Sequence, residues 1–353
     1  MITEIKLKNF RLFEDISFKT NNSLIIFSGK NAVGKTSILE GIYLCGTSKS
    51  HRDNDVTNII KDGYDYASVE INDEKKYRVF ISKDTKSYFI NKAQYKRVSD
   101  FIGDLRLVLF SPYDLNLIDG TKSIRRRFLD LEISLVDKEC LRYLSNYKKL
   151  LNERNEALKS KSVDKTIINV ITDELINNLL VVYKKRIDFI NSMNELLIDI
   201  SMNLGLDTIR LEYESSYNPN NIKKSFYQKL ERDLLTKTTN IGIHRDDFKI
   251  LLNDKDASIY ASNGQKHLIC IAIKLALKEY IKTKCNEEPI LLLDDVFQSL
   301  DKEKIRKLTE YVKKSKQAFI TTTSILDIPD EILKDALVLR IENNKEKVNG
   351  KGN

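Results

Sequence analysis

The chain has 353 residues, of which 41% are hydrophobic and 31% are charged. With 12 glycines and 4 prolines, this composition excludes collagen-like, mucin-like and intrinsically disordered proteins and fits one substantial core with an appendage. Lysine and arginine outnumber aspartate and glutamate by 59 to 51, a formal charge of +8 that fits a polyanionic partner and equally fits a lysine-rich composition.

The cysteines and the N-terminal segment predict a cytoplasmic protein. The 4 cysteines are scattered, without C-x-x-C spacing or a short disulfide framework, and the 3 histidines give no zinc signature. The segment MITEIKLKNF lacks the apolar core of a signal peptide. No run approaches the roughly 18 apolar residues that span a bilayer. We therefore expect a reducing, aqueous compartment and no membrane partner.

The first third of the chain predicts short strands around one helix. Residues 2–7 and 23–28 have strand patterns, the second continuously apolar, and residues 37–44 have helical spacing. Alternating residues over 66–92 predict an antiparallel meander, and residues 107–110 form a further apolar strand.

The middle of the chain is helical. Residues 122–204 contain neither proline nor glycine, and their apolar side chains recur at steps of three and four. This pattern predicts two long antiparallel helices joined by a turn at 160–162. A strand at 208–215 and a helix at 222–235 follow.

Strands and helices alternate again from residue 238 onward. The clearest of them are an apolar run at 290–293 and a helix over 302–315. The tail from Asn343 is polar, and we expect it to fray.

A phosphate-binding loop follows the second strand. The sequence GKNAVGKT matches G-x-x-x-x-G-K-[ST] between a buried strand and a helix, which is the context that this loop requires. Its glycines let backbone N–H groups point at phosphate oxygens, Lys35 faces the β- and γ-phosphates, and the Thr36 hydroxyl coordinates Mg²⁺. The motif predicts a nucleoside triphosphate site made of Gly29, Lys30, Asn31, Ala32, Val33, Gly34, Lys35 and Thr36.

Two carboxylates complete the predicted catalytic set. The apolar run at 290–293 is typical of a central parallel strand, and it ends in Asp294 and Asp295 at the edge where ligands bind. Asp294 can hold Mg²⁺, and Asp295 can orient or deprotonate the attacking water. The alternative is an ordinary strand-to-turn boundary, which the presence of the phosphate-binding loop disfavours. Lys35, Asp294 and Asp295 are the predicted catalytic residues.

A second phosphate-binding feature lies between these motifs. Ser262, Asn263, Gly264 and Gln265 begin a helical run, where Ser262 is a good N-cap and free backbone N–H groups favour a phosphate. The loop at 29–36 already binds the phosphates within its own chain. A second site of this kind therefore suggests a nucleotide site that is completed by another subunit.

This order of motifs resembles the ATP-binding-cassette (ABC) ATPases of the chromosome and DNA-repair class, and within that class the RecF family. The likeness covers nearly the whole chain and is carried by KNFRLF, GKNAVGKTSILEGI, SKSHR, LVLFSPYDLNLIDG, RRRFLD, IGIHRDD, ASNGQKH and LLLDDVFQSLD. It implies an α/β fold of the P-loop ABC-type ATPase class, with an antiparallel β subdomain and an inserted helical arm domain. We place one ATPase lobe at 1–120, the arm at 121–236 and a second lobe at 237–353.

The resemblance also implies cofactors, partners and residue roles. ATP and Mg²⁺ are the implied cofactors, with ATP-dependent homodimerisation, slow hydrolysis, and binding of double-stranded DNA at gaps or single-strand/double-strand junctions. RecR and RecO are the implied partners in loading RecA and supporting the SOS response. Residues 262–267 would contact the γ-phosphate of the partner subunit, and Asp301 would lie in a loop crossing the dimer interface. Asp114 stands where other cassettes carry a metal-contacting glutamine, and 321–323 replace the catalytic histidine of transporters.

Several alternatives remain open. Arg125, Arg126 and Arg127 can touch a DNA backbone, although such a run is more often a solvated or salt-bridged helix face. A transporter ATPase subunit expects a catalytic histidine and no long insertion, and an ATPase-nuclease needs a further acidic domain. The +8 charge without a base-reading motif predicts DNA binding through phosphates with little sequence preference.

Overall fold

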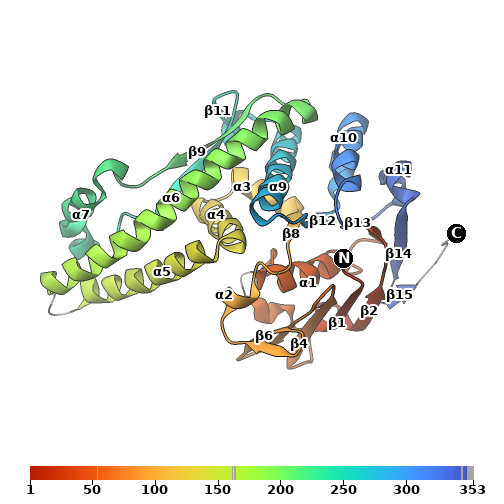
Figure 1. Ribbon diagram of the computed structural model, residues 1–353, viewed down its shortest axis with the longest axis horizontal. Coiled ribbons are helices and arrows are strands. Elements are labelled where there is room, and N and C mark those ends of the chain that lie inside the picture. Colours follow the sequence, from red (N-terminus) through yellow and green to blue (C-terminus); the bar gives the residue numbers. More distant parts are fainter. Residues whose placement is uncertain (54, 161, 163, 343–344, 348–353) are drawn as a thin grey trace. The chain divides into compact units, whose positions relative to one another are not determined.

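The computed structural model describes residues 1–53, 55–160, 162, 164–342 and 345–347. The chain divides into two compact units, whose elements are drawn in Figure 1. Unit 1 comprises Met1–Leu115, Asn203–Leu206 and Ser262–Asn353. Unit 2 comprises Asn116–Met202 and Asp207–Ala261.

Unit 1 contains an antiparallel sheet that matches the predicted meander. Its strands, in order across the sheet, are β2 (Phe13–Lys19), β1 (Glu4–Phe10), β4 (Tyr66–Asn72), β5 (Lys76–Ser82), β6 (Lys86–Ile90) and β7 (Ala93–Tyr95). Side chains in β4 and β5 alternate between buried and more exposed positions, so one face of the sheet belongs to the core of the unit. The helix α1 (Lys35–Thr47) contacts β4, β1 and β5 of this sheet.

The second sheet of unit 1 is mainly parallel. Its strands, in order, are β15 (Lys345–Lys347), β14 (Ala336–Glu342), β3 (Leu24–Ser28), β13 (Ala318–Thr322), β12 (Ile290–Asp294) and β8 (Leu107–Phe110), with only the β14–β15 pair antiparallel among these. Every residue of β3, β8, β12 and β13 is buried, which explains their continuous apolar runs. The parallel register brings Ser28, Thr322 and Asp294 to the same edge of the sheet, where the phosphate-binding loop begins.

The remaining elements of unit 1 are helical. They are η1 (Val56–Ile59), α2 (Val98–Phe101), η2 (Pro112–Leu115), α9 (Asn263–Cys285), η4 (Val296–Ser299), α10 (Lys302–Lys313), η5 (Ile325–Asp327) and α11 (Asp330–Leu333), where η denotes a 3-10 helix.

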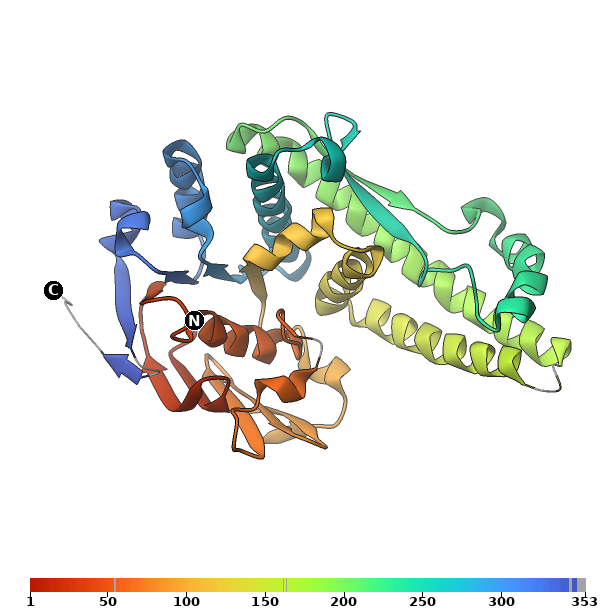
Figure 2. The same ribbon diagram turned by 180° about the vertical axis from the view of Figure 1, so that it is seen from behind.

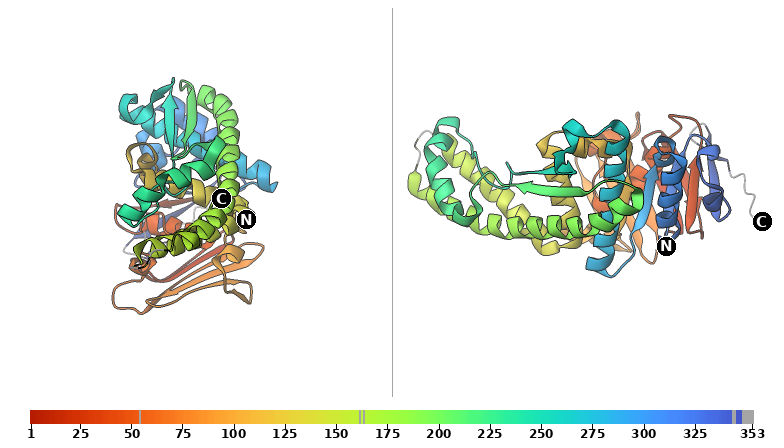
Figure 3. Two further views of the ribbon diagram at one scale, coloured as in Figure 1. Left: turned by 90° about the vertical axis from the view of Figure 1, so that its left-hand side faces the viewer. Right: turned by 90° about the horizontal axis from the view of Figure 1, so that it is seen from above.

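Unit 2 is built on long helices, as Figures 2 and 3 show. Its helices are α3 (Asn116–Asp119), α4 (Lys122–Val136), α5 (Lys138–Lys159), α6 (Lys165–Leu204, whose last two residues fall in unit 1), η3 (Pro219–Asn221), α7 (Ile222–Thr236) and α8 (Ala257–Tyr260). A small antiparallel sheet has the order β11 (Lys255–Asp256), β10 (Asp247–Leu252) and β9 (Ile209–Glu214). The helices α5 and α6 run side by side in opposite directions, which confirms the predicted antiparallel pair.

Buried ion pairs hold the helices of unit 2 together. Arg154 Nη1 of α5 lies 2.8 Å from Asp233 Oδ2 of α7, and the two side chains are 1% and 0% exposed. Arg154 also donates hydrogen bonds to the hydroxyl groups of two nearby threonines. Arg186, which interrupts the apolar spacing of α6, is buried and donates to Asp130 and to the Tyr213 hydroxyl. Each buried guanidinium thus has a countercharge and further acceptors, as burial of a charge requires.

Among the described residues, one helix is long and apolar enough to cross a membrane, judged by length and composition alone. This helix is α6, and its buried side chains include Leu175, Phe189 and Leu197. Core helices of soluble proteins pass the same test, so a single such helix is weak evidence for a membrane span.

Most predicted elements are confirmed, but two are not as predicted. The strand β2 is not predicted, because its three buried side chains are irregularly spaced along the strand. The helical middle contains a third helix, α4, which ends before Asp137. Asp137 then caps α5 by accepting a hydrogen bond from the backbone N–H of Cys140, so the break needs neither proline nor glycine.

Three further predictions meet the structure only in part. In the predicted turn at 160–162, Lys161 lies outside the described residues. In the polar tail from Asn343, which we expect to fray, residues 345–347 form β15 and the others lie outside the described residues. Residues 237–261, which we placed in the second lobe, belong to unit 2 because β10 pairs with β9.

Candidate nucleotide-binding site

The phosphate-binding loop joins β3 to α1, and its two glycines lie against other parts of unit 1. A Cβ atom on Gly34 would lie 2.5 Å from the ring of Phe13, and Gly34 has a positive φ of 104°. A Cβ atom on Gly29 would lie 2.5 Å from the carbonyl oxygen of Ile341. Ala32, between them, also has a positive φ, of 64°. Packing and backbone conformation together therefore require the glycines of the motif.

The amine of Lys35 is held over this loop. Its Nζ donates to the carbonyl oxygens of Gly29 at 2.8 Å and Lys30 at 2.9 Å, and the residue is 4% exposed. Burial lowers the pKa of Lys35, while Asp295 and Asp294 oppose that shift. A cation is thus fixed where the loop would enclose phosphate oxygens, as the motif predicts.

Asp294 lies at the carboxyl end of β12 beside two hydroxyl groups. Thr36 Oγ1 donates to Asp294 Oδ1 at 2.8 Å, and Thr321 Oγ1 donates to the same oxygen at 2.7 Å. Burial raises the pKa of Asp294, and the two hydroxyl donors act in the opposite direction. The structure therefore brings together the two predicted metal ligands, Thr36 and Asp294, from positions that are far apart in the chain.

These oxygens fit Mg²⁺. Mg²⁺ takes hard oxygen ligands, and in nucleotide sites one or two protein groups hold it together with phosphates and water. The adjacent oxygens of Thr36 and Asp294 are such a pair. Among the described residues, no group of three or more His, Cys, Asp or Glu side chains is arranged to hold a metal.

Asp295 adopts the left-handed conformation, with φ 50°, directly after β12. Its backbone N–H donates to Thr321 Oγ1 at 3.0 Å, so a single threonine hydroxyl contacts both acidic residues. The Asp295 carboxylate accepts a hydrogen bond from Gln298 at 3.4 Å. Burial and the neighbouring Asp294 raise the pKa of Asp295, which suits a group that accepts a proton.

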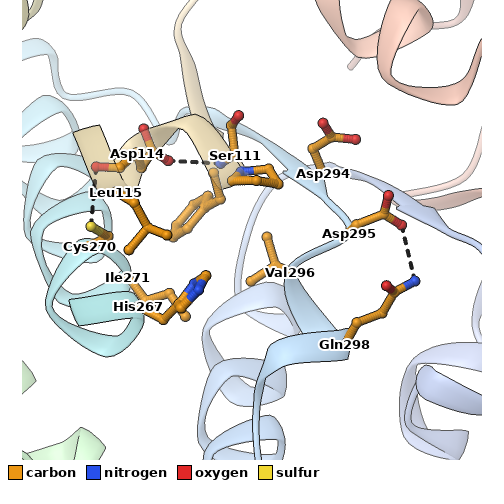
Figure 4. Close-up of a pocket in the computed structure, with 12 residues that line it drawn as sticks. Ser111, Asp114, Leu115, His267, Cys270, Ile271, Asp294, Asp295, Val296 and Gln298 are labelled. Carbon is orange, nitrogen blue, oxygen red and sulfur yellow. Dashed lines mark hydrogen bonds between the residues drawn. The ribbon is translucent and has the colours of Figure 1, made fainter. Parts of the chain in front are cut away.

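Asp295 lines two cavities. One, of about 340 Å³, is lined by Asp294, Asp295 and Gln298 on one side and by His267 and Cys270 of α9 on the other, as Figure 4 shows. The other has about 430 Å³ and extends along the phosphate-binding loop. Its lining residues are Arg11, Leu12, Asn31, Ala32, Gly34, Lys35, Thr36, Ser37, Arg52, Asn58, Ile60, Asp62 and Asp295.

Arg11 and Arg52 are the two arginines among the lining residues to which the sequence pattern assigns no role. Arg11 lies in the KNFRLF stretch and Arg52 in the SKSHR stretch. Both stretches contribute to the resemblance, but the sequence does not indicate a role for either arginine. Their position becomes informative once the fold brings both residues to the lining of the cavity that Lys35 also lines.

The predicted N-cap of α9 is confirmed. Ser262 Oγ accepts a hydrogen bond from the Gln265 backbone N–H at 3.3 Å, and Gln265 Oε1 accepts one from the Ser262 N–H at 2.9 Å. This reciprocal capping box occupies two of the N–H groups that we expected to be free for a phosphate. Asn263 and Gly264 are exposed, and no atom lies within 4 Å of the position of a Cβ on Gly264.

Two further acidic residues have structural partners within unit 1. Asp301 caps α10 by accepting a hydrogen bond from the Lys304 N–H at 3.0 Å. Asp114 pairs with Lys274 of α9 at 3.0 Å and accepts a hydrogen bond from the Ser111 N–H at 2.7 Å. Burial raises the pKa of Asp114, and Lys274 opposes this. Asp114 therefore links the segment after β8 to α9, while the interface role of Asp301 stays a prediction.

The basic run of α4 lies in unit 2. Arg125 donates to Asp247 at 2.8 and 3.0 Å, and Arg126 donates to the backbone carbonyl of Asp246 at 2.8 Å. The salt-bridged alternative therefore describes Arg125, while Arg126 is hydrogen-bonded to the backbone. Arg127 is exposed. Contact of this run with DNA stays a prediction.

Comparison with known proteins identifies the family. A family model described as the RecF/RecN/SMC N-terminal domain matches residues 1–328. The DNA replication and repair protein RecF of Acholeplasma laidlawii is 40% identical over 325 residues, covering 91% of this chain and 93% of that protein. The chain belongs to the RecF family. RecF of a Geobacillus species is 34% identical over 361 residues, with 96% of each chain covered.

A solved structure of a RecF family member supports the fold assignment. The recombination mediator protein RecF with ATP, from the RecFOR pathway, is 26% identical, with a TM-score of 0.90 and coverage of 98% of this chain and 96% of that one. The predicted fold class is therefore confirmed: a P-loop ABC-type ATPase fold with an antiparallel sheet, a parallel sheet and a helical part.

Proposed function

We propose that the chain is an ATP-dependent DNA-binding protein of recombinational repair and replication-fork recovery. In this proposal ATP binding drives homodimerisation on double-stranded DNA at gaps or junctions, and slow, DNA-stimulated ATP hydrolysis resets the protein. The observation that carries it is that the hydroxyl groups of Thr36 and Thr321 both donate hydrogen bonds to Asp294, at 2.8 and 2.7 Å. These groups lie beside the loop that holds Lys35. The ATP-bound relative supports ATP as the nucleotide.

The same relatives support the cellular context. RecF relatives are named DNA replication and repair proteins, and the ATP-bound structure is of a recombination mediator in the RecFOR pathway. On this basis we propose RecR and RecO as partners in loading RecA, with a role in the SOS response, in the cytoplasm. Matches to RecF over 91% or more of the chain favour this proposal over a transporter ATPase or an ATPase-nuclease.

The chemistry follows from the side chains at the sheet edge. Lys35 and the backbone of the loop would neutralise and orient the phosphates. Thr36 and Asp294 would hold Mg²⁺, which when bound supplies charge neutralisation at the phosphate oxygens. Asp295, whose pKa is raised by burial and by Asp294, would accept the proton of the attacking water. Ser262 would contact the γ-phosphate of the partner subunit.

The test of this function is a titration of gapped DNA with and without ATP. We expect ATP to strengthen binding by the wild-type protein, and Lys35→Ala to remove the ATP effect because it removes the charge facing the phosphates. Affinity should fall steeply with salt and vary little with base sequence, since phosphate contacts dominate. Equal binding with and without ATP, or strong preference for one duplex sequence, would contradict the proposal.

The two-subunit site has its own test. Ser262→Arg should leave ATP binding by the monomer nearly intact, while ATP-dependent dimerisation and hydrolysis fail together because two-fold symmetry damages both sites. Loss of the N-cap adds local destabilisation of about 1 kcal/mol. Ser262→Thr, which keeps a capping hydroxyl, is the matched control. Light scattering and nucleotide fluorescence measure the two properties, and a variant that dimerises with ATP yet no longer binds it as a monomer refutes the composite site.

A further inference from the structure

A buried carboxylate lies in α1, one and a half turns after Lys35. Glu40 is 0% exposed, and its two oxygens accept hydrogen bonds from Arg11 Nε at 2.9 Å and Arg11 Nη2 at 2.7 Å. Ser50 Oγ donates to Glu40 Oε1 at 2.5 Å, and Arg52 Nη1 lies 3.7 Å from Glu40 Oε2. A single acidic group thus faces two arginines and a serine hydroxyl.

Both arginines also line the cavity along the phosphate-binding loop. Arg11 follows β1 in the left-handed conformation, with φ 53°, and its Nη1 donates to the carbonyl oxygen of Asn58 at 2.8 Å. Glu40 and Asn58 therefore fix the plane of the Arg11 guanidinium from two sides. The Arg11 side chain is 18% exposed, so part of it faces the cavity.

Arg52 is held differently. Its side chain is 34% exposed, and the 3.7 Å separation from Glu40 is an ion pair rather than a short hydrogen bond. Arg52 lines the same cavity as Lys35 and Thr36. Arg11 is thus rigidly oriented, while Arg52 is tethered by charge.

Stability alone does not account for this arrangement. Replacing a buried ion pair by apolar side chains is often neutral or stabilising, so a buried glutamate in a core helix is weak evidence for a stabilising role. A carboxylate does, however, fix the planar fork of an arginine, and oriented guanidinium groups bind phosphate oxygens in pairs of hydrogen bonds. Lowering the freedom of these groups before the ligand arrives strengthens binding.

We propose that Glu40 is a positioning residue of the nucleotide site, which orients Arg11 and tethers Arg52 so that both guanidinium groups meet the phosphates of the bound triphosphate. This inference rests on the proposed ATP site and adds a residue that does not itself line the cavity.

The principal test replaces Glu40 with Gln, which keeps its size but removes the charge. We expect the dissociation constant for ATP to rise about 10- to 100-fold, since hydrogen bonds between charged groups are lost. Turnover at saturating ATP should change little, because binding rather than the chemical step is affected. Inorganic tripolyphosphate should lose affinity in parallel with ATP, since the proposed contacts are to phosphates. Loss of ATP affinity with unchanged tripolyphosphate affinity would overturn the proposal.

A double-mutant cycle separates positioning from a merely structural role. If Glu40 acts mainly through Arg11, the double variant Arg11→Ala/Glu40→Gln should lose much less ATP affinity than the sum of the two single losses, with only the contribution of Arg52 remaining. Additive losses, or a lower melting temperature with unchanged ATP affinity, would refute the positioning role. The matched control is Glu288→Gln, which removes a glutamate paired with Lys278 and Lys282 outside the cavity lining. Its ATP affinity should match that of the wild type.

Two further variants keep the test decisive if Glu40→Gln does not fold. Glu40→Asp keeps the charge and should restore part of the affinity, and Arg11→Lys keeps Glu40 paired but removes the planar fork, so it should weaken ATP binding. Wild-type affinity in Arg11→Lys would overturn the proposal. A wild-type protein that does not bind ATP would instead refute the proposed function, which distinguishes the two failures.

Discussion

The hydroxyl group of Thr321 connects the two acidic residues of the site, and its removal should shift the pH dependence of ATP hydrolysis. Thr321 is 1% exposed, donates to Asp294 at 2.7 Å and accepts from the Asp295 N–H at 3.0 Å. Thr321→Val keeps the shape and removes both hydrogen bonds. Burial already raises the pKa of Asp294, and Thr321 is the larger of the two hydroxyl effects that oppose this. The variant should therefore raise the pKa of Asp294 further.

The size and sign of the effect follow from this hydrogen bond. A hydrogen bond to a charged group contributes about 1.5–3 kcal/mol, and about 1.4 kcal/mol corresponds to a tenfold change in a protonation equilibrium. In the proposed site Asp294 would hold Mg²⁺ in its ionised form, which is populated above its pKa. Raising the pKa therefore moves the acidic limb of the activity profile upward, by about one to two pH units, and activity at low pH is lost first.

The assay is Mg²⁺-dependent ATP hydrolysis at saturating ATP, measured across pH. Thr321→Ser keeps the hydroxyl and should overlay the wild-type profile. Thr322→Val is the matched control, since Thr322 is also 1% exposed but donates to the Ser324 carbonyl oxygen instead of to Asp294. An unshifted profile for Thr321→Val, or an equal shift for Thr322→Val, would show that the hydroxyl does not tune Asp294.

Three other substitutions test separate parts of the structure. Asp295→Asn should retain ATP but slow its hydrolysis, which prolongs the ATP-bound state. A loss of nucleotide binding as large as that of Lys35→Ala would contradict the proposed role of Asp295 as the base. Gly34→Ala should lower the free energy of unfolding by about 1–3 kcal/mol in a urea titration and impair ATP binding, because its Cβ would lie 2.5 Å from the Phe13 ring at a positive φ. Asp233→Asn leaves the buried Arg154 without its countercharge and should cost about 3–5 kcal/mol of stability by urea denaturation, whereas a loss below 1 kcal/mol would refute that pairing.

Features that depend on neighbouring residues could be read from the sequence. The phosphate-binding loop is specified within residues 29–36, and its strand and helix lie directly beside it. The N-cap at Ser262 is likewise local, because its partner Gln265 is three residues away. Apolar runs predicted β3 and β12 because a strand buried on both faces needs apolar side chains at every position.

Contacts that depend on tertiary register could not be read. Thr321 lies 27 residues after Asp294, and the two meet only because β12 and β13 pair in parallel with these residues opposite each other. The pattern TTT showed where a transporter histidine would stand but not which threonine meets the carboxylate. Similarly, β10 pairs with β9 although α7 separates the two strands in the sequence. No local signal therefore places residues 237–261 in unit 2.

In the helix α1, apolar periodicity does not distinguish a buried face from an exposed face, but the charged residues of the sequence are still informative. All of its residues except Thr36 are buried, so its apolar side chains do not define one face. Lys35 and Glu40 are its two charged residues, and a charge inside such a helix needs a partner or a ligand. The motif explains Lys35, which the loop carbonyls also hold. Glu40 has no motif, yet the same argument applies to it, and its partners are the two arginines on the wall of the nucleotide cavity. A buried charge in a helix that follows a phosphate-binding loop is therefore a reason to examine the nucleotide site before assuming a structural role.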